Sequence, residues 1–377
     1  MIRLAVLTTF ALSFVPVLSA QAQETTAMPE SAICPAAEPM VTGLAPDTPD
    51  GIIVTAFDGS GIWTYDVARN SRYPLPDTTP CAGACRLSPD GSELLYLYPA
   101  TNAFNRMRLD GGERSMVVEY AGQVEWWADG QFLVYTPGRN AYVIGGPDGR
   151  VDLVGDGIVS VQPNGHWALV IANNAGQPVR ALRDLAAEPG SPVGQLPLAP
   201  DRLYANAAAW SPSGDRLAFV APVGATSSEI FGVRPGAGVP QRWTDLTSEV
   251  GSVRINGQAT GELAWSPDGE KIAFWVIPLE GGSPEAPLQP AIIHILDVTT
   301  GQVQRMCGYQ TMAHTPNPPR LVWAPDSTHV AFADDVPGQA RGTLVVLNTA
   351  TGEFRALTSG IAGVNGPPNL IAWGGQP

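Results

Sequence analysis

The stretch "LAWSPDGEKIAF", residues 263–274, is one of several related stretches in this chain. Each copy has an apolar start, a turn-forming centre and an apolar finish. The copies follow one another at intervals of roughly 35 to 60 residues, the range of a propeller blade with its loops. The others are "CRLSPDGSELLY" (85–96), "VEWWADGQFLVY" (124–135), "VSVQPNGHWALV" (159–170), "AAWSPSGDRLAF" (208–219) and "LVWAPDSTHVAF" (321–332).

One copy builds a small antiparallel sheet. Trp265, Ile272 and Phe274 alternate with smaller or polar residues, which indicates strands. Between them, "SPDG" has the residues of a type I turn followed by a left-handed glycine. We therefore interpret its aspartate as a turn former and not as a metal ligand. Another apolar run, "AIIHILDV", a second turn, "TTGQ", and "VQRMCGY" follow, so the unit has four antiparallel strands.

The repeats predict an all-β fold, a β-propeller of four-stranded blades, and seven blades is the count that we favour. Ringing the sheets around an axis buries both faces of each sheet. The last strand-like segment, residues 370–375, matches the first strand of a repeat, and no further strand of that repeat follows it. The first repeat, near residue 51, lacks its first strand and begins with its second. The C-terminal strand is thus expected to pair with residues 52–57 and close the ring. Six or eight blades and an open solenoid stay possible, because two copies are degraded.

The motif "WSPDGxxIAF" followed by "LDVxTG" resembles the WD-like propeller repeat of the TolB family, over residues 51–375. The resemblance implies a single propeller domain at residues 51–377. Residues 23–50 are expected to form an N-terminal extension in place of the α/β domain that precedes the propeller in TolB. It also leaves an enzyme open, since oligogalacturonate lyase is a TolB-like propeller that gathers a metal from scattered histidines.

Residues 1–22 have the pattern of a cleaved signal peptide: a basic start, an apolar run and the small residues of "AQA". The run is shorter than the roughly 20 residues of a spanning helix, so no membrane insertion is expected after signal removal. The mature protein is expected to be periplasmic or secreted. Its formal net charge of −14 argues against nucleic acid and anionic lipid as partners.

Four cysteines in an exported chain indicate two disulfides, for which three pairings are possible. The short spacing of Cys81 and Cys85 favours a local bridge, which would leave Cys34 to join the N-terminal segment to Cys307. Zinc is not expected, because there is no CxxC pair and no histidine near Cys81. No other cofactor is indicated.

Binding residues are expected on one face of the disc, where the second-to-third loops and the blade links lie. These connections carry nearly all the long insertions, and loops on a rigid scaffold gather binding residues. The insertions cover residues 247–261, 278–290, 310–319, 334–342 and 358–368. Their candidate binding residues are Arg254, Glu280, His314, Arg320, Asp334, Asp335 and Arg341.

The chain has no recognisable catalytic set. Its four histidines fall in different repeats, and none has the spacing of a local metal pair. The favoured hypothesis is a monomeric, exported, non-catalytic scaffold that binds a protein or peptide through the long-loop face. The alternative is a metal-assisted polysaccharide lyase or hydrolase that uses the pore mouth, and a purely structural or sensory module is a third possibility.

Overall fold

The computed structural model describes residues 31–374 apart from several short segments. The segments left out are 35–39, 58–60, 76–77, 79–84, 99, 128–129, 136–140, 145–149, 152–156, 175–176, 188–193, 197–206, 225, 237–238, 257–262, 283–288, 313–316 and 362–368. The expected signal peptide, residues 1–22, lies outside the described residues.

The described residues form seven sheets, which we number from the sheet that holds both ends of the chain of repeats. Sheet 1 consists of β31 (Asn369–Gly374), β3 (Ile52–Phe57), β4 (Gly61–Asp66) and β5 (Ser71–Pro74). Sheet 2 consists of β6 (Arg86–Leu87), β7 (Glu93–Tyr98), β8 (Ala103–Arg108) and β9 (Ser115–Glu119). Sheet 3 consists of β10 (Gln123–Trp126), β11 (Phe132–Tyr135), β12 (Ala141–Ile144) and β13 (Arg150–Val151).

The other four sheets repeat this order. Sheet 4 consists of β14 (Gly157–Val161), β15 (Trp167–Asn174), β16 (Gln177–Asp184) and β17 (Gly194–Leu196). Sheet 5 consists of β18 (Ala208–Trp210), β19 (Leu217–Val223), β20 (Ser227–Val233) and β21 (Gln241–Arg242). Sheet 6 contains β23 (Ala264–Trp265), β24 (Lys271–Pro278), β25 (Ala291–Asp297) and β26 (Val303–Thr311), and sheet 7 contains β27 (Val322–Trp323), β28 (His329–Asp334), β29 (Thr343–Asn348) and β30 (Glu353–Thr358).

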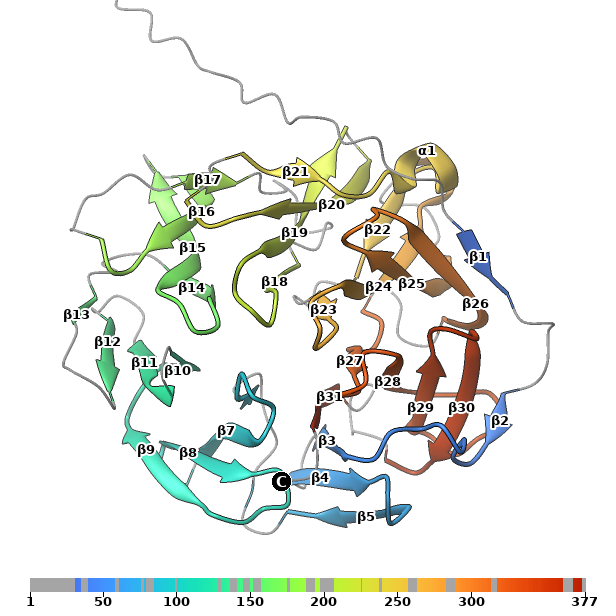
Figure 1. The fold of residues 1–377 in the computed structure, drawn as a ribbon, viewed down its shortest axis with the longest axis horizontal. Helices are drawn as coiled ribbons and strands as arrows, with labels where there is room; N and C mark the ends of the chain where they lie inside the picture. The colour runs from blue at the N-terminus through green and yellow to red at the C-terminus, as the bar shows by residue number, and fades with distance from the viewer. Residues whose placement is uncertain are drawn as a thin grey trace, which may run out of the picture.

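The sheets stand around a common centre, with the first strand of each repeat innermost (Figure 1). The chain is therefore an all-β propeller. Seven clusters of buried side chains lie between the sheets, and each sheet shares one cluster with the sheet before it and one with the sheet after it. Sheet 1 follows the same rule, because its Ile53 packs with sheet 7 and its Ile52 packs with sheet 2. Each sheet thus buries both faces against its neighbours.

Sheet 1 joins the two ends of the repeat array. β31 pairs antiparallel with β3, with Trp373 opposite Ile53 and Gly374 opposite Ile52. Gly51 has a φ of 149°, and a Cβ atom there would lie 2.5 Å from the carbonyl oxygen of Gly374. Glycine is required at this position because the two chain segments approach so closely.

The turns between the first and second strands have the predicted chemistry. In sheet 6 the amide of Gly269 donates to the carbonyl of Ser266 over 2.9 Å, and Gly269 has a φ of 73°. The Ser266 hydroxyl donates to Asp268 Oδ1 over 2.5 Å, and the amide of Glu270 donates to the same oxygen over 3.0 Å. Burial works to raise the pKa of Asp268, but these hydrogen bonds, together with Ser327 and the charge of Lys271, outweigh it and the pKa is lowered. The aspartate is a turn former, as predicted.

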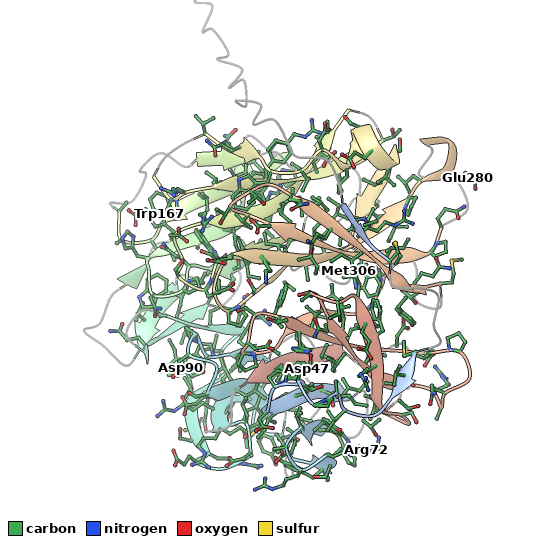
Figure 2. The ribbon with its side chains drawn as sticks, turned by 45° about the vertical axis from the view of Figure 1, so that its right-hand side comes forward. Asp47, Arg72, Asp90, Trp167, Glu280 and Met306 are labelled. Carbon is green, nitrogen blue, oxygen red and sulfur yellow. A yellow bond between two sulfur atoms is a disulfide. The ribbon has the colours of Figure 1, made fainter. Side chains whose placement is uncertain are left out.

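The N-terminal extension adds strands to the outer edges of two sheets. β1 (Ser31–Ile33) pairs in parallel with β26, and β2 (Val41–Thr42) pairs in parallel with β30. Beyond β2, Asp47 Oδ2 accepts a hydrogen bond from Asn348 Nδ2 over 2.9 Å and lies 3.8 Å from Nε2 of His329 in sheet 7 (Figure 2). The sequence analysis did not anticipate these two strands, because they are short and their partners are far away in the chain.

The Cys34–Cys307 disulfide links the extension to β26. This bridge was one of the pairings favoured from the sequence, and it spans 273 residues of sequence. Cys85 is disulfide-bonded too. Its expected partner, Cys81, lies outside the described residues.

The segment 247–261, expected to be a loop, contains regular structure. Helix α1 (Leu246–Val250) is followed by β22 (Val253–Ile255), which pairs with the end of β24. The helix depends on Glu229 of β20, a fully buried side chain that accepts hydrogen bonds from the amides of Leu246 and Thr247 over 3.0 and 2.8 Å. The Thr244 hydroxyl and the Arg242 guanidinium donate to the same carboxylate.

No helix in the described part of the chain is long and apolar enough to cross a membrane.

Because the pKa values of the turn aspartates are lowered, we expect part of the free energy of unfolding to be lost in acid. Hydrogen bonds from Ser88 and Ser92 also lower the pKa of Asp90 below the ordinary value of 3.8. The stability that Asp90 and Asp268 contribute is therefore complete above pH 3.8 and is lost as the pH falls through their lower, folded-state pKa values. We expect an Asp90→Asn, Asp268→Asn variant to be less stable than the wild type at pH 7 in urea unfolding, with a difference that shrinks below pH 4. A difference independent of pH would contradict this prediction.

Glu229 is predicted to be the most sensitive side chain of the α1 segment. We expect Glu229→Gln to lower the free energy of unfolding by about 3 kcal/mol, because the amide cannot accept all the hydrogen bonds and leaves Arg242 with less compensating charge. The measurement is urea unfolding followed by tryptophan fluorescence. Glu249→Gln is the control, since Glu249 is exposed on the same helix. Equal effects of the two substitutions would show that the buried carboxylate does not hold the segment.

Candidate functional site

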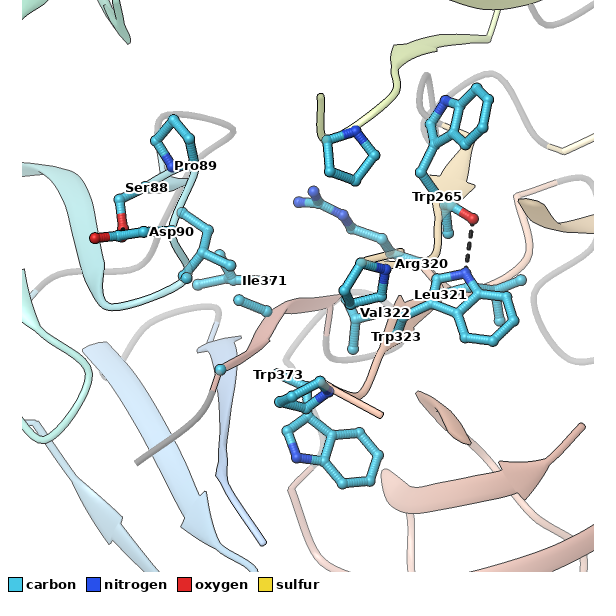
Figure 3. Close-up of a pocket in the computed structure, with 18 of the residues that line it drawn as sticks. Ser88, Pro89, Asp90, Trp265, Arg320, Leu321, Val322, Trp323, Ile371 and Trp373 are labelled. Carbon is cyan, nitrogen blue, oxygen red and sulfur yellow. Dashed lines mark hydrogen bonds between the residues drawn. The ribbon is translucent and has the colours of Figure 1, made fainter. Parts of the chain in front are cut away.

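The inner strands enclose a cavity of about 370 Å³ on one side of the central channel (Figure 3). Sheets 1, 2, 5, 6 and 7 all contribute to its lining. Residues before the inner strands, such as Arg320 and Leu263, line it together with residues of the turns after those strands, such as Pro267 and Pro325. In sheets 6 and 7 the cavity therefore extends from the residues before the inner strand to the turn after it.

The lining is mainly apolar. Its apolar residues include Leu321, Val322, Ile371, Trp265 and Trp323. The second residue of four turns, which is proline in each, completes it at the short-turn end: Pro89, Pro212, Pro267 and Pro325. A lining of apolar side chains with few polar groups is typical of sites for small ligands or chain segments.

The recurrent tryptophan of the repeat links neighbouring inner strands. The indole N–H of Trp323 donates to the carbonyl of Ala264 in sheet 6 over 2.7 Å. Trp265 donates likewise to Ala209 over 2.9 Å, and Trp126 donates to Arg86 over 3.1 Å. These hydrogen bonds fix the spacing of the strands that line the channel. The sequence analysis used Trp265 only as evidence for strand alternation and did not anticipate these hydrogen bonds.

A second cavity, of about 210 Å³, lies between the inner strands of sheets 2 to 5. It holds an ion pair in which Arg86 Nε lies 3.1 Å from Glu125 Oε2. Gln123 donates to Glu125 Oε1 over 2.7 Å. The positive charge of Arg86 is therefore balanced by Glu125 in the same cavity wall.

Arg320 is the predicted site residue that reaches the larger cavity. Its guanidinium points from the start of β27 into the open space (Figure 3). Its backbone is held in place, because the indole N–H of Trp275 donates to the carbonyl of the preceding Pro319 over 2.7 Å. Trp275 is itself fully buried, with its ring 5.5 Å from that of Phe332.

The other predicted residues occupy different environments. Asp335 Oδ2 lies 3.5 Å from Arg341 Nε in the connection between β28 and β29, so the structure brings these two together. Glu280 is exposed in a short 3-10 segment (Glu280–Gly282) at the periphery, where Gln289 donates to it over 2.8 Å (Figure 2). His314 lies outside the described residues.

Arg254 and Asp334, both expected at an exposed rim, are buried. Arg254 is 4% exposed on β22, which the sequence analysis took for a loop. Asp334 is 0% exposed at the end of β28 and accepts a hydrogen bond from the Tyr309 hydroxyl over 2.8 Å. Burial, together with the Asp334 carboxylate, raises the pKa of Tyr309. Asp334 is thus part of the packing between sheets 6 and 7.

The described histidines sit in hydrogen-bonded positions. His329 Nδ1 lies 2.7 Å from Asp326, His166 Nδ1 lies 2.5 Å from Asp184, and His294 Nδ1 lies 3.0 Å from the carbonyl of Ile292. Among the described residues, no group of three or more His, Cys, Asp or Glu side chains could hold a metal ion. No observation in this part of the chain favours the metal-assisted alternative.

The sequence analysis did not identify several residues of the channel wall that the repeat pattern could have revealed. Pro89, Pro267 and Trp323 stand at fixed places in the repeat, next to the inner strand. The recurrence of one residue type at one register could have placed these side chains around the axis. This recurrence could not show which sheets form the cavity wall, because among the described residues only five of the seven sheets contribute to it.

No family model matches the chain, and no curated protein matches it. Solved structures of similar fold include TolB from Acinetobacter baumannii, at 18% identity and a TM-score of 0.45, covering 87% of this chain and 81% of that one. AztD from Citrobacter koseri, in its apo form, has 13% identity and a TM-score of 0.47, covering 86% and 98%. Oligogalacturonate lyase in complex with manganese has 14% identity and a TM-score of 0.46, covering 76% and 82%. These likenesses concern the fold alone.

The tryptophan hydrogen bonds predict a difference between two equivalent positions. We expect Trp323→Phe to lower the free energy of unfolding by about 1 kcal/mol more than Trp210→Phe. Both side chains are buried on inner strands, but the Trp210 indole N–H has no hydrogen-bond partner among the described residues. Urea unfolding of the two variants is the measurement. A larger loss for Trp210→Phe would show that the hydrogen bond to Ala264 does not stabilise the ring.

Proposed function

We propose that this protein is an exported, non-catalytic propeller that binds a peptide or a protein segment in its central channel, entered from the long-loop face. The observation that carries the proposal is the apolar cavity of about 370 Å³ with Arg320 at its long-loop end. Its volume falls in the range of small-ligand sites, roughly 300 to 1,000 Å³. A short extended segment fits such a space better than the surface of a folded domain.

We further propose that the seven sheets are the seven blades of a closed ring. The pairing of β31 with β3 and the two clusters on either side of sheet 1 support this. A closed ring keeps the channel walls at fixed spacing, so the cavity does not have to form when a ligand arrives. Such preorganisation lowers the entropic cost of binding.

Export is supported by the covalent link between Cys34 and Cys307. Disulfides persist in oxidising compartments and are rare where thiols are kept reduced. The apolar, signal-like start of the sequence points the same way. We propose a periplasmic or secreted location on these two grounds, and a chain that resembles the TolB family in its propeller repeats.

The test is to narrow the channel and measure peptide binding. Peptides selected against the wild-type protein from a random display library are expected to lose at least 10-fold in affinity on Pro267→Trp or Pro325→Trp, since both side chains line the cavity and stand on exposed turns. Isothermal titration calorimetry measures the affinity. Thr300→Trp is the matched control, because Thr300 is exposed on an outer turn between β25 and β26. Binding that is unchanged in both channel variants would refute the channel as the site.

A further inference from the structure

We propose that the larger cavity takes up one large, uncharged apolar side chain of the bound peptide, and that the channel selects its ligand by this anchor side chain. The inference rests on the proposed peptide-binding function and names the chemistry that the same site recognises. Its ground is an account of the polar groups in the wall. Each polar side chain of the described lining already has a partner within the protein or is buried, so the side chains of the wall offer apolar contact.

The two charged residues of the described lining, Asp90 and Arg320, are both engaged. Asp90 Oδ1 accepts hydrogen bonds from the Ser88 and Ser92 hydroxyls over 2.6 and 2.8 Å. Arg320 has an interaction of its own within the protein. A charged ligand side chain would give up its water on entering the cavity and would have to compete with these contacts. The wall therefore disfavours a charged anchor.

The other polar side chains of the described lining are not available to a ligand either. The indole N–H groups of Trp265 and Trp323 already donate to backbone carbonyls of the preceding sheet. The indole N–H of Trp373 has no partner among the described residues, but it is buried beside Gly51. The four turn prolines have no N–H group to donate. A ligand group that needs no hydrogen bond suits such a wall.

The apolar part of the wall is fixed, because its residues belong to four different clusters between sheets. Leu263 packs between sheets 5 and 6, and Leu321 packs between sheets 6 and 7. Val322 packs between sheets 7 and 1, and Ile371 packs between sheets 1 and 2. All four are buried. Closely packed residues cannot move apart freely, so the cavity keeps its shape when it is empty.

The size of the cavity favours a large side chain over a small one. Its volume of about 370 Å³ leaves room for an aromatic or a branched aliphatic side chain. An aromatic side chain buries roughly 150 to 250 Å² when it is enclosed, whereas a methyl group would leave most of the wall without contact. The free energy of hydrophobic burial grows with the apolar area that is removed from water.

The second cavity differs from the larger one in its chemistry. The two cavities adjoin, because Leu87 and Pro89 line both. The second cavity contains the ion pair of Arg86 and Glu125, whose Nε and Oε2 atoms are 3.1 Å apart. An apolar side chain placed there would reduce the access of water to two charges. The anchor side chain is accordingly assigned to the larger cavity, and the second cavity supplies the control.

The experiment scans peptides that were selected against the wild-type mature protein from a random display library. Each position of a peptide is changed in turn to Ala, Glu and Lys, and the affinity is measured by isothermal titration calorimetry. We expect each peptide to contain one large apolar residue whose change to Ala weakens binding at least 10-fold, since its burial is lost. Glu or Lys at that position should weaken binding at least as much as Ala does.

Two substitutions in the protein test where the anchor side chain lies. In Pro267→Trp the introduced ring occupies the larger cavity, so the difference in affinity between a peptide and its Ala form should shrink. Val159→Trp is the matched control, because Val159 is 38% exposed and lines the second cavity but is not among the described residues that line the larger one. In this variant the difference should stay as large as in the wild type.

The outcomes separate this inference from the proposed function. If Pro267→Trp weakens the peptides but the scan finds no sensitive apolar position, or finds that the sensitive position is charged, the channel binds peptides and the apolar anchor is refuted. A difference that disappears in Val159→Trp but not in Pro267→Trp would place the anchor in the second cavity and refute its assignment. Decanoate that binds more tightly than every selected peptide, and loses this binding in Pro267→Trp, would assign the cavity to an acyl chain instead of a peptide side chain. If no library peptide binds in the channel, both proposals are overturned.

Discussion

Each sheet of this protein has two apolar faces, and neither can be left in water. The seven buried clusters satisfy this constraint, because each lies between one sheet and the next. Sheet 1 is part of the same arrangement through Ile52 and Ile53, whose side chains point to opposite neighbours. The pairing of β31 with β3 then joins the two ends of the repeat array. Packing between sheets is what holds the inner strands around a common centre.

The channel and its chemistry follow from that packing. Packing between the sheets keeps the inner strands apart, and the cavity lies between them. Hydrogen bonds such as that from Trp323 to the carbonyl of Ala264 fix the spacing of neighbouring inner strands. Turn prolines and apolar side chains make the space hydrophobic. Arg320 is a basic group in this mostly apolar wall. The same residue on an outer strand would be one of many solvated charges.

The parts of the fold that the sequence did not predict depend on distant partners. β1 and β2 are short, and each acquires its hydrogen bonds from an outer strand that lies far along the chain. Helix α1 forms against the buried Glu229, whose side chain receives the amides of its first residues. Such segments have little periodicity of their own. Their structure is decided by the edge or the buried carboxylate that they meet.

The sequence alone determined the repeating unit, because strand alternation and turn chemistry are local: "SPDG" forms its turn through atoms a few residues apart. It also supplied Arg320 as a candidate and favoured the Cys34–Cys307 bridge among the possible pairings. Only the tertiary structure decided which charged residues are buried. Arg254 and Asp334 lie inside the protein, and Arg320 lines the channel. The physical reason is that side-chain burial depends on how sheets pack against one another, and that packing involves residues from tens to hundreds of positions apart.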